Sequence, residues 1–245
     1  MDLEQKIADT LALLQRIGTE FKPAVFANSF GAEDMVLTDL IAKHNINIQS
    51  FSLDTGRLPN ETYELMQKVH ERYPSHPVQV FFPDAGQIES WVNANGINSI
   101  YDSIELRKAC CHIRKGEPLK RALAGKTAWV TGLRREQSPT RTDLGNQEYD
   151  SGNGLEKFNP LIEWTEKDVW AYLRANNVPY NALHDKHYPS IGCAPCTRAI
   201  AVGEDVRAGR WWWENPENKE CGLHVKSDVV SIIPVSSSLS AAPGR

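Results

Sequence analysis

Short apolar runs alternate with amphipathic stretches along most of this chain, and that order constrains its fold more than any other feature. Four of the runs predict buried strands, over residues 24–27, 46–53, 78–82 and 127–131. The spacing of apolar residues predicts helices over residues 3–18, 33–43, 60–73, 87–95, 113–124 and 165–176. Strands that alternate with helices are typical of a parallel sheet covered on both faces. We therefore expect an α/β fold.

Local signals set some of the boundaries of these elements. Gly18 is expected to end the first helix, and Thr165 with Asp168 has the spacing of a capping box at the start of the last one. After Pro179 the pattern gives way to a loop-rich segment, and residues 236–245 have the composition of a disordered, mobile tail.

The charge balance and the lack of long apolar runs exclude several classes of partner. The chain has 27 Lys and Arg against 31 Asp and Glu, so its net charge of −4 gives no general reason to bind nucleic acid. No apolar run approaches the roughly 18–20 residues of a membrane span, and the N-terminus lacks the profile of a signal peptide. Five cysteines are too few for a disulfide scaffold, which favours a reducing cytoplasm. We expect a cytoplasmic protein without nucleic-acid or membrane partners.

The cysteines fall into two pairs and a single residue. Cys110 is adjacent to Cys111, and Cys193 and Cys196 form a C-x-x-C. Two pairs of thiols can supply four ligands to one iron–sulfur cluster or one zinc ion, and the residues alone do not separate these metals. Adjacent side chains on a regular helix diverge by about 100°. For Cys110 and Cys111 to share one centre, the backbone must therefore depart from regular helix; if they do not, they are two buried apolar residues.

The remaining thiol, Cys221, is a candidate nucleophile, with His224 three residues away. Its neighbour Glu220 would raise the pKa of the thiol, whereas Arg207, Arg210 or a protonated His224 would lower it. A flexible Gly222 suits a thiol that must move between a substrate and a partner. The alternative is a surface thiol with no function.

Two loops follow predicted strands at the edge where an open α/β sheet binds ligands. Ser29 and Gly31 lie in the first of them, where the serine can donate hydrogen bonds to phosphate and the glycine allows close backbone approach. The second loop begins at Leu53 and could line a nucleotide pocket through its backbone groups. Neither has the Gly-x-x-x-x-Gly-Lys pattern of ATP-hydrolysing proteins, and an ordinary strand–helix turn is the alternative for the first.

Basic residues gather near the predicted strand ends and near the cysteines. Gly132 leads into a basic segment that contains Arg141, Lys115 follows the adjacent cysteine pair, and Arg207 and Arg210 precede three tryptophans. Any one of these cations could be ordinary surface charge. Together they predict a site for a phosphate or a sulfate, which guanidinium groups bind in a forked geometry.

In this order the motifs resemble the assimilatory adenylyl-sulfate reductases, the iron–sulfur branch of the phosphoadenylyl-sulfate reductase family. The resemblance runs from about residue 24 to 224 and is carried by residues 29–34, 53–57, 110–115, 131–135, 193–196 and 220–224. It implies an adenine nucleotide α-hydrolase-like twisted sheet and a [4Fe-4S] cluster on Cys110, Cys111, Cys193 and Cys196. It also implies an α/β domain over residues 1–200 and a C-terminal segment, 201–245, that carries the nucleophile.

The chemistry that the resemblance implies is a reduction in two stages. Cys221 attacks the sulfur of adenosine 5′-phosphosulfate, AMP leaves, and thioredoxin or glutaredoxin releases sulfite from the resulting S-sulfocysteine. Lys115 and His224 would assist Cys221. The substrate-binding residues would be Ser29, Gly31, Leu53, Gly132, Arg141, Arg207 and Arg210, with Lys115 also holding the phosphosulfate. Members of the family are often dimers or tetramers, so a homo-oligomer is compatible with the resemblance.

Three other functions compete with this one. The other branch of the family uses the 3′-phosphorylated nucleotide and lacks the four cluster cysteines, although some cluster-bearing members accept both substrates. An ATP-consuming sulfur transferase acting on tRNA would need a Ser-Gly-Gly-x-Asp-Ser loop, which residues 29–34 do not match. The third is a non-catalytic zinc- or cluster-binding regulator. Phe30 stands where some members have serine, and no thioredoxin-like domain follows Cys221, so the reductant is expected to be a separate protein.

Overall fold

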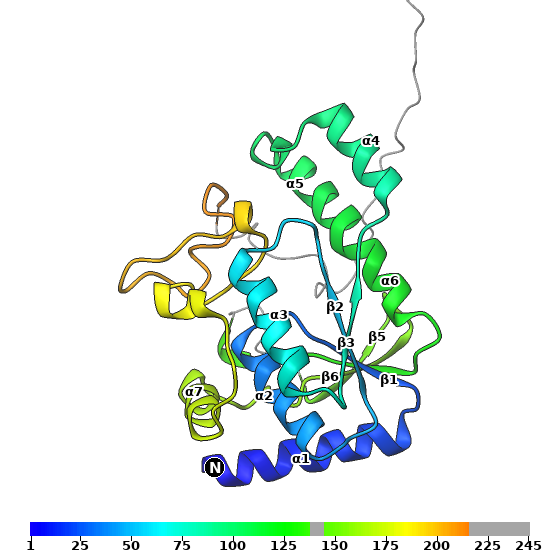
Figure 1. The fold of residues 1–245 in the computed structure, drawn as a ribbon, viewed down its shortest axis with the longest axis vertical. Helices are drawn as coiled ribbons and strands as arrows, with labels where there is room; N and C mark the ends of the chain where they lie inside the picture. The colour runs from blue at the N-terminus through cyan, green and yellow to red at the C-terminus, as the bar shows by residue number, and fades with distance from the viewer. Residues whose placement is uncertain (138–144, 216–245) are drawn as a thin grey trace, which may run out of the picture.

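The computed structural model describes residues 1–137 and 145–215 (Figure 1). Within them six strands form one sheet in the order β3-β2-β1-β4-β6-β5, and only β5 runs antiparallel to its neighbour. The strands are β1 Ala24–Ala27, β2 Gln49–Leu53, β3 Val78–Phe81, β4 Ala128–Val130, β5 Gln147–Asp150 and β6 Leu155–Phe158. The α-helices are α1 Leu3–Glu20, α2 Ala32–Lys43, α3 Asn60–Arg72, α4 Ala85–Asn95, α5 Ile104–Cys111, α6 Glu117–Leu123 and α7 Glu166–Ala175.

Helices cover the two faces of the sheet, and each face forms its own core. Phe26 and Val130 point to the face covered by α1, α2, α3 and α7. Their neighbours Val25 and Trp129 point to the opposite face and pack against α6. Successive side chains of a strand alternate between faces, so runs that are apolar throughout require two cores. The expected α/β sheet is therefore confirmed. No helix in the described part of the chain combines the length and apolar character needed to cross a membrane.

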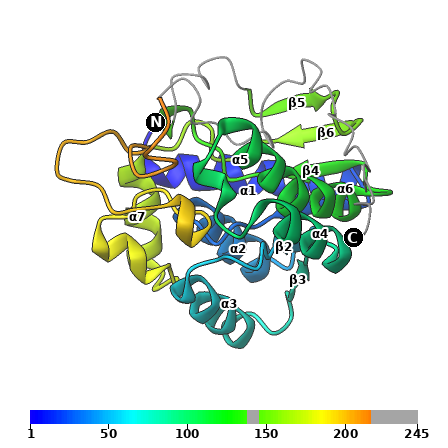
Figure 2. The same cartoon turned by 90° about the horizontal axis from the view of Figure 1, so that it is seen from above.

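The strand order creates a crevice between β1 and β4. From β1 the chain moves outward to β2 and then β3, and it returns to place β4 on the other side of β1. The loops that follow β1 and β4 therefore leave adjacent strands in opposite directions. In open α/β sheets this point of reversal is where ligands bind. Residues 180–215, yellow to orange in Figures 1 and 2, lie between α7 and the α5–α6 stretch.

The first helix does not end at Gly18, as the sequence predicted, but continues to Glu20. A Cβ atom on Gly18 would lie 3.0 Å from Ile46 Cγ2 and 3.3 Å from the backbone nitrogen of Asn47. The glycine therefore allows close packing against the residues before β2. A glycine that permits helix packing and one that ends a helix look alike in a sequence.

Helix α5 and the hairpin of β5 and β6 were not predicted. Strand β5 is largely exposed and polar, so it lacks the apolar run that marks a buried strand. Helix α5 begins where the Ser103 side chain accepts a hydrogen bond from Leu106 N at 3.1 Å. It leads through a π-helical turn, His112–Gly116, into α6. The departure from regular helix that the adjacent cysteines required thus begins one residue after Cys111. Such turns are frequent at functional sites.

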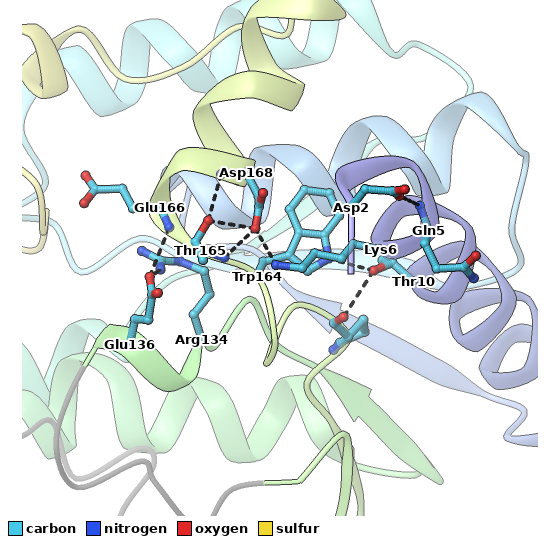
Figure 3. Close-up of polar contacts among 11 residues, drawn as sticks. Asp2, Gln5, Lys6, Thr10, Arg134, Glu136, Trp164, Thr165, Glu166 and Asp168 are labelled. Carbon is cyan, nitrogen blue, oxygen red and sulfur yellow. Dashed lines mark hydrogen bonds and ion pairs between the residues drawn. The ribbon is translucent and has the colours of Figure 1, made fainter.

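The start of α7 is fixed by the predicted capping box, which Figure 3 shows. Thr165 Oγ1 accepts from Asp168 N at 3.2 Å, and Asp168 Oδ2 accepts from Thr165 N at 2.9 Å. Lys6 of α1 adds an ion pair to Asp168 at 2.6 Å. The backbone nitrogen of Glu166 donates to Glu136 Oε2 at 3.2 Å. These contacts hold the N-terminus of α7 beside the segment that follows β4.

Candidate active site

A cavity of about 580 Å³ lies at the crevice between β1 and β4. Its walls come from the loops after β1, β2 and β4, from the π-helical turn and from the segment before Trp211. The predicted site residues that line it are Ser29, Gly31, Leu53, Lys115, Gly132, Arg207 and Arg210. The fold thus brings these seven residues to one place, although their roles as substrate ligands stay predictions. Arg141, Cys221 and His224 lie outside the described residues.

The loop after β1 is held by hydrogen bonds to the side chain of Asp34. Ser29 donates to Asp34 Oδ2 from its backbone nitrogen at 2.7 Å and from its hydroxyl at 2.6 Å. The left-handed residue of the loop is Phe30, with φ of 60°, and its ring is buried in the core. The Phe30 side chain therefore does not face the cavity. Strain of this kind costs about 1–3 kcal/mol and is common at binding sites.

Asp34 also joins the loop after β1 to the loop after β4. Its carboxyl group is buried and interacts with the backbone of Gly132. A Cβ atom on Gly132 would collide with Asp34 Oδ1, so any larger residue there would displace the Asp34 carboxyl group. Burial raises the pKa of Asp34 to about 7, against the lowering effect of its hydrogen bonds from Ser29. No local signal in the sequence marked Gly132 as a partner of this acid.

Arg210 is held in the cavity wall by its packing. The guanidinium lies 4.6 Å from the ring centroid of Trp211, and Nη1 donates to Ser190 Oγ at 3.2 Å. A Cβ atom on Gly192 would lie 2.7 Å from Arg210 Cζ, so this glycine makes room for the guanidinium. With Lys115 and Arg207 it forms a group of three cations that line the cavity. Such a group can bind the oxygens of a phosphate or sulfate.

Arg134 also lines the cavity, but acidic side chains compensate its charge. Its Nε lies 2.8 Å from Glu33 Oε1, and its Nη1 lies 3.1 Å from Glu136 Oε2. The guanidinium is almost fully buried, so removing both acids would leave a costly buried charge. We therefore assign Arg134 to the structure of the loop after β4.

Three of the four paired cysteines lie in one apolar cluster beside the cavity. Cys110 and Cys196 are buried against Ile100 and Trp211, and Cys193 packs against the same group. The structure has Cys110, Cys111, Cys193 and Cys196 as free thiols. Burial raises the pKa of Cys110, and it raises the pKa of Cys196 to about 11. Thiolates at these positions therefore need nearby positive charge or a metal.

The loop after β2 connects the cavity to this cysteine cluster. Thr55 Oγ1 lies 3.2 Å from Cys193 Sγ, and the carbonyl of Thr55 accepts from Arg114 Nη1 at 2.6 Å. Arg114 in turn acts on Cys110 through its charge and a hydrogen bond, and both lower the pKa of the thiol. The charges of Lys115 and Arg210 likewise lower the pKa of the Cys196 thiol. The cations of the cavity wall thus also face the thiols.

The residues around the cysteines fit an iron–sulfur cluster. Arg114 Nε and Trp211 Nε1 are buried and have no hydrogen-bond partner among the described residues. Unused donors and cations suit the acceptor sulfurs and the negative charge of a thiolate-bound cluster. Within residues 1–137 and 145–215, no three His, Cys, Asp or Glu side chains converge on a point that could hold a metal ion.

A buried ion pair holds the segment after Arg210 against α5. Arg107 Nε lies 2.8 Å from Glu214 Oε1, and Arg107 Nη2 lies 2.7 Å from Glu214 Oε2. The guanidinium also stacks on the Trp211 ring at 4.7 Å and interacts with Cys111. The sequence gave no sign of this pair, because its members are 107 residues apart.

Comparisons with known proteins agree with this architecture. The family described as phosphoadenosine phosphosulfate reductase domain matches residues 23–199. A protein of Allochromatium vinosum named adenosine 5′-phosphosulfate reductase is 56% identical over 222 residues, covering 91% of this chain and 86% of that protein. A protein of the same name from Burkholderia cepacia is 51% identical over 241 residues, covering 98% of this chain and 95% of that protein.

Solved structures include similar folds. The phosphoadenylyl-sulfate reductase of Candida auris, crystallised as a phosphate complex, aligns with a TM-score of 0.67 at 26% identity, covering 81% of this chain and 96% of that chain. Yeast FAD synthetase aligns with a TM-score of 0.54 at 17% identity, covering 80% of this chain and 67% of that chain. The second likeness concerns the fold alone.

Proposed function

This chain belongs to the phosphoadenosine phosphosulfate reductase family, a family of reductases, and from that membership we propose that it reduces adenosine 5′-phosphosulfate to sulfite and AMP. The observation that carries the proposal is the grouping of Lys115, Arg207 and Arg210 in one cavity beside the cysteine cluster. The names of the relatives at 56% and 51% identity support the choice of substrate.

In the first stage, Cys221 and the cations of the cavity act together. The Cys221 thiolate attacks the sulfur of the bound phosphosulfate, and the bond from that sulfur to the bridging oxygen breaks. Its electron pair leaves with AMP, and the sulfonate stays on Cys221 as an S-sulfocysteine. Thiolate and phosphosulfate are both anionic, so Lys115, Arg141, Arg207 and Arg210 would lower the barrier by offsetting their repulsion. A protonated His224 would favour the thiolate form of Cys221.

In the second stage a separate dithiol protein, thioredoxin or glutaredoxin, supplies two electrons. One of its thiolates attacks Cys221 Sγ, and sulfite leaves with the electron pair of the sulfur–sulfur bond. Its second thiol then resolves the mixed disulfide, which restores Cys221 and leaves the partner oxidised. We place this reaction in cytoplasmic sulfate assimilation, with residues 1–200 as the nucleotide-binding domain and 201–245 as the segment that delivers the nucleophile.

Cys110, Cys111, Cys193 and Cys196 are the residues that would hold a [4Fe-4S] cluster. Bound there, it would tie α5 to the C-x-x-C loop and add negative charge next to the substrate cations. Lys115 and Arg210 would offset that charge while they hold the phosphosulfate. The four cysteines also favour the nucleotide without a 3′-phosphate, because the branch of the family that uses the 3′-phosphate lacks them.

The test is transfer of label from ³⁵S-labelled adenosine 5′-phosphosulfate to anaerobically purified protein without reductant. Label bound covalently to Cys221, and released as sulfite by reduced thioredoxin, is the expected result. A Cys221→Ser protein serves as the control and should take up none. Label on the unsubstituted protein only from the 3′-phosphorylated nucleotide would reassign the substrate. No label from either nucleotide would contradict the reductase and favour a non-catalytic role.

A further inference from the structure

The 3₁₀-helix Ala182–Lys186 forms part of the cavity wall, and its backbone is firmly held. The Asn181 side chain accepts from Leu183 N at 3.0 Å and donates to Thr62 Oγ1 of α3, also at 3.0 Å. Leu183 is buried. His184 therefore projects from a turn that contacts with α3 hold in place.

The His184 ring lines the cavity and is packed on α7. It meets the ring of Trp170 edge-on, with centroids 5.3 Å apart and planes at 83°. Its Nε2 atom is buried and has no hydrogen-bond partner among the described residues. A buried polar atom without a partner costs about 1–3 kcal/mol, so such an atom in a binding cavity is a candidate ligand contact.

The surroundings of the ring favour the neutral form with its proton on Nδ1. Burial lowers the pKa of His184, which keeps the ring neutral at pH 7, while a hydrogen bond to the backbone of Tyr188 acts in the opposite direction. A backbone group that favours the protonated ring must be a carbonyl, because its oxygen accepts a hydrogen bond from a ring N–H. Because Nε2 has no partner, an interaction with that carbonyl would use Nδ1. In the neutral tautomer with its hydrogen on Nδ1, Nε2 offers a lone pair that a donor on the ligand would satisfy.

The charges around the cavity divide into two groups. Glu33, Asp185 and Glu166 act electrostatically on His184, and all three line the cavity. Figure 3 shows the Glu166 carboxylate pointing away from the contacts that anchor α7. Of the five Lys and Arg residues that line the cavity, Arg134 is compensated by Glu33, and Arg174 lies over the Trp170 ring.

Lys115 and Arg210, by contrast, act on Cys196 of the cysteine cluster. The anionic phosphosulfate therefore suits the part of the cavity beside the thiols. A group with hydrogens to donate suits the part beside His184, where the protein presents acceptors.

We infer that His184 is a further substrate-contacting residue, whose Nε2 accepts a hydrogen bond from the nucleoside part of the substrate. This inference rests on the proposed function, which supplies the nucleotide. The nucleoside of AMP offers two kinds of donor, the ribose hydroxyls and the 6-amino group of adenine. Either kind would satisfy the buried lone pair, and a phosphate would not.

The test compares AMP affinities by calorimetry in anaerobically purified, cluster-loaded protein. His184→Phe keeps the ring packing on Trp170 and removes the acceptor, so AMP should bind about 3- to 10-fold more weakly, as expected for one lost hydrogen bond. His184→Gln, which restores an acceptor oxygen, should recover part of the loss. His70→Phe, at an exposed site on α3, is the matched control and should bind AMP as the unsubstituted protein does.

Nucleotide analogues then identify the donor. 2′-Deoxy-AMP, 3′-deoxy-AMP and IMP each lack one candidate donor. The analogue without the relevant group should bind the unsubstituted protein more weakly than AMP but should lose nothing further in His184→Phe. The inference would be overturned if His184→Phe and the unsubstituted protein bound AMP equally well. It would also be overturned if the substitution weakened the binding of AMP and of all three analogues by the same factor. Should His184→Phe fail to fold by circular dichroism, His184→Leu takes its place under the same criteria.

The two hypotheses fail in different ways. If the unsubstituted protein binds AMP and takes label on Cys221, the proposed function stands, and the His184→Phe result judges the histidine alone. If the unsubstituted protein neither binds AMP nor takes label, the proposed function fails and the inference about His184 fails with it.

Discussion

At the residue scale, Lys115 and Asp34 show how the surroundings of a single side chain set what it can do. Lys115 lines the cavity and also lowers the pKa of Cys196, so its charge acts on both the cavity and the cysteine cluster. Asp34 is an acid whose burial favours its neutral form and whose partners lie on two loops. Both roles depend on neighbours that are distant in sequence.

We predict that Lys115→Ala slows the first stage of the reaction by about 100-fold or more, the usual effect of removing one group that stabilises developing charge. The reason is that the thiolate and the phosphosulfate would then repel each other with less compensation. Single-turnover transfer of ³⁵S label measures it. Lys120→Ala, exposed and five residues further along, should transfer label at the normal rate. A Lys115→Ala rate within about threefold of normal would contradict the role of the charge.

Asp34 should make stability depend on pH. Because its pKa rises from 3.8 in the unfolded chain to about 7 in the folded protein, folding takes up a proton in that range. Stability from this group is therefore lost as pH rises from about 4 to about 7, by at most about 1.4 kcal/mol per pH unit. We predict that Asp34→Asn removes this slope, measured by denaturant unfolding at several pH values.

Asp168→Asn provides the contrasting control. Although burial raises the pKa of Asp168, hydrogen bonds from Lys6 and Thr165 lower it to about 2. Its contribution is present above pH 4 and lost only on further acidification, so this substitution should shift stability by a constant amount between pH 4 and 7. Equal slopes in Asp34→Asn and unsubstituted protein would disprove the assignment to Asp34.

At the element scale, the contacts of α5 explain how two distant segments are brought to one place. Helix α5 carries Arg107, Cys110 and Cys111, and the π-helical turn after it carries Lys115. Arg107 binds Glu214, which fixes the segment that contains Trp211 beside the cysteines. One helical stretch thus positions thiols, a cation of the cavity and the last described segment of the chain.

We predict that Glu214→Gln destabilises the protein by about 3–5 kcal/mol, because it leaves the buried Arg107 charge without a counter-charge. Denaturant unfolding measures the loss, and limited proteolysis should show faster cleavage near residues 211–215. Glu117→Gln, which breaks the more exposed pair with Lys120, should cost less than about 1 kcal/mol. Similar small losses in both proteins would show that the Arg107 pair is not important for stability.

At the scale of the whole molecule, we expect the thiols to divide between cluster binding and catalysis. Cys196→Ser removes a thiol of the buried group and should cost the protein its iron and its visible absorbance. Cys221→Ser should keep both and lose label transfer entirely. Iron analysis of the two anaerobically purified proteins, alongside the transfer assay, makes the comparison. Full iron in Cys196→Ser, or turnover in Cys221→Ser, would contradict the division.

The extent to which the sequence predicted the structure varies from residue to residue. The apolar runs located β1 to β4, because buried strands leave a local pattern. The edge strand β5 left none, and Gly18 was assigned to the wrong role. Residue type and spacing singled out the cysteine pairs and Lys115 as candidates, and their roles stay predictions. No local pattern marked Asp34 as a link between loops or His184 as a cavity residue.

The sequence by itself determined the class of fold and the residue types available for chemistry, because strand and helix periods and cysteine spacing are local properties of a chain. Only the tertiary structure decided which of those residues meet. The reversal of strand order between β1 and β4 brings Asp34 to Gly132, and packing on α5 brings Arg107 to Glu214. Contacts of that kind join residues about one hundred positions apart, and they form through the burial of whole elements rather than through any local pattern.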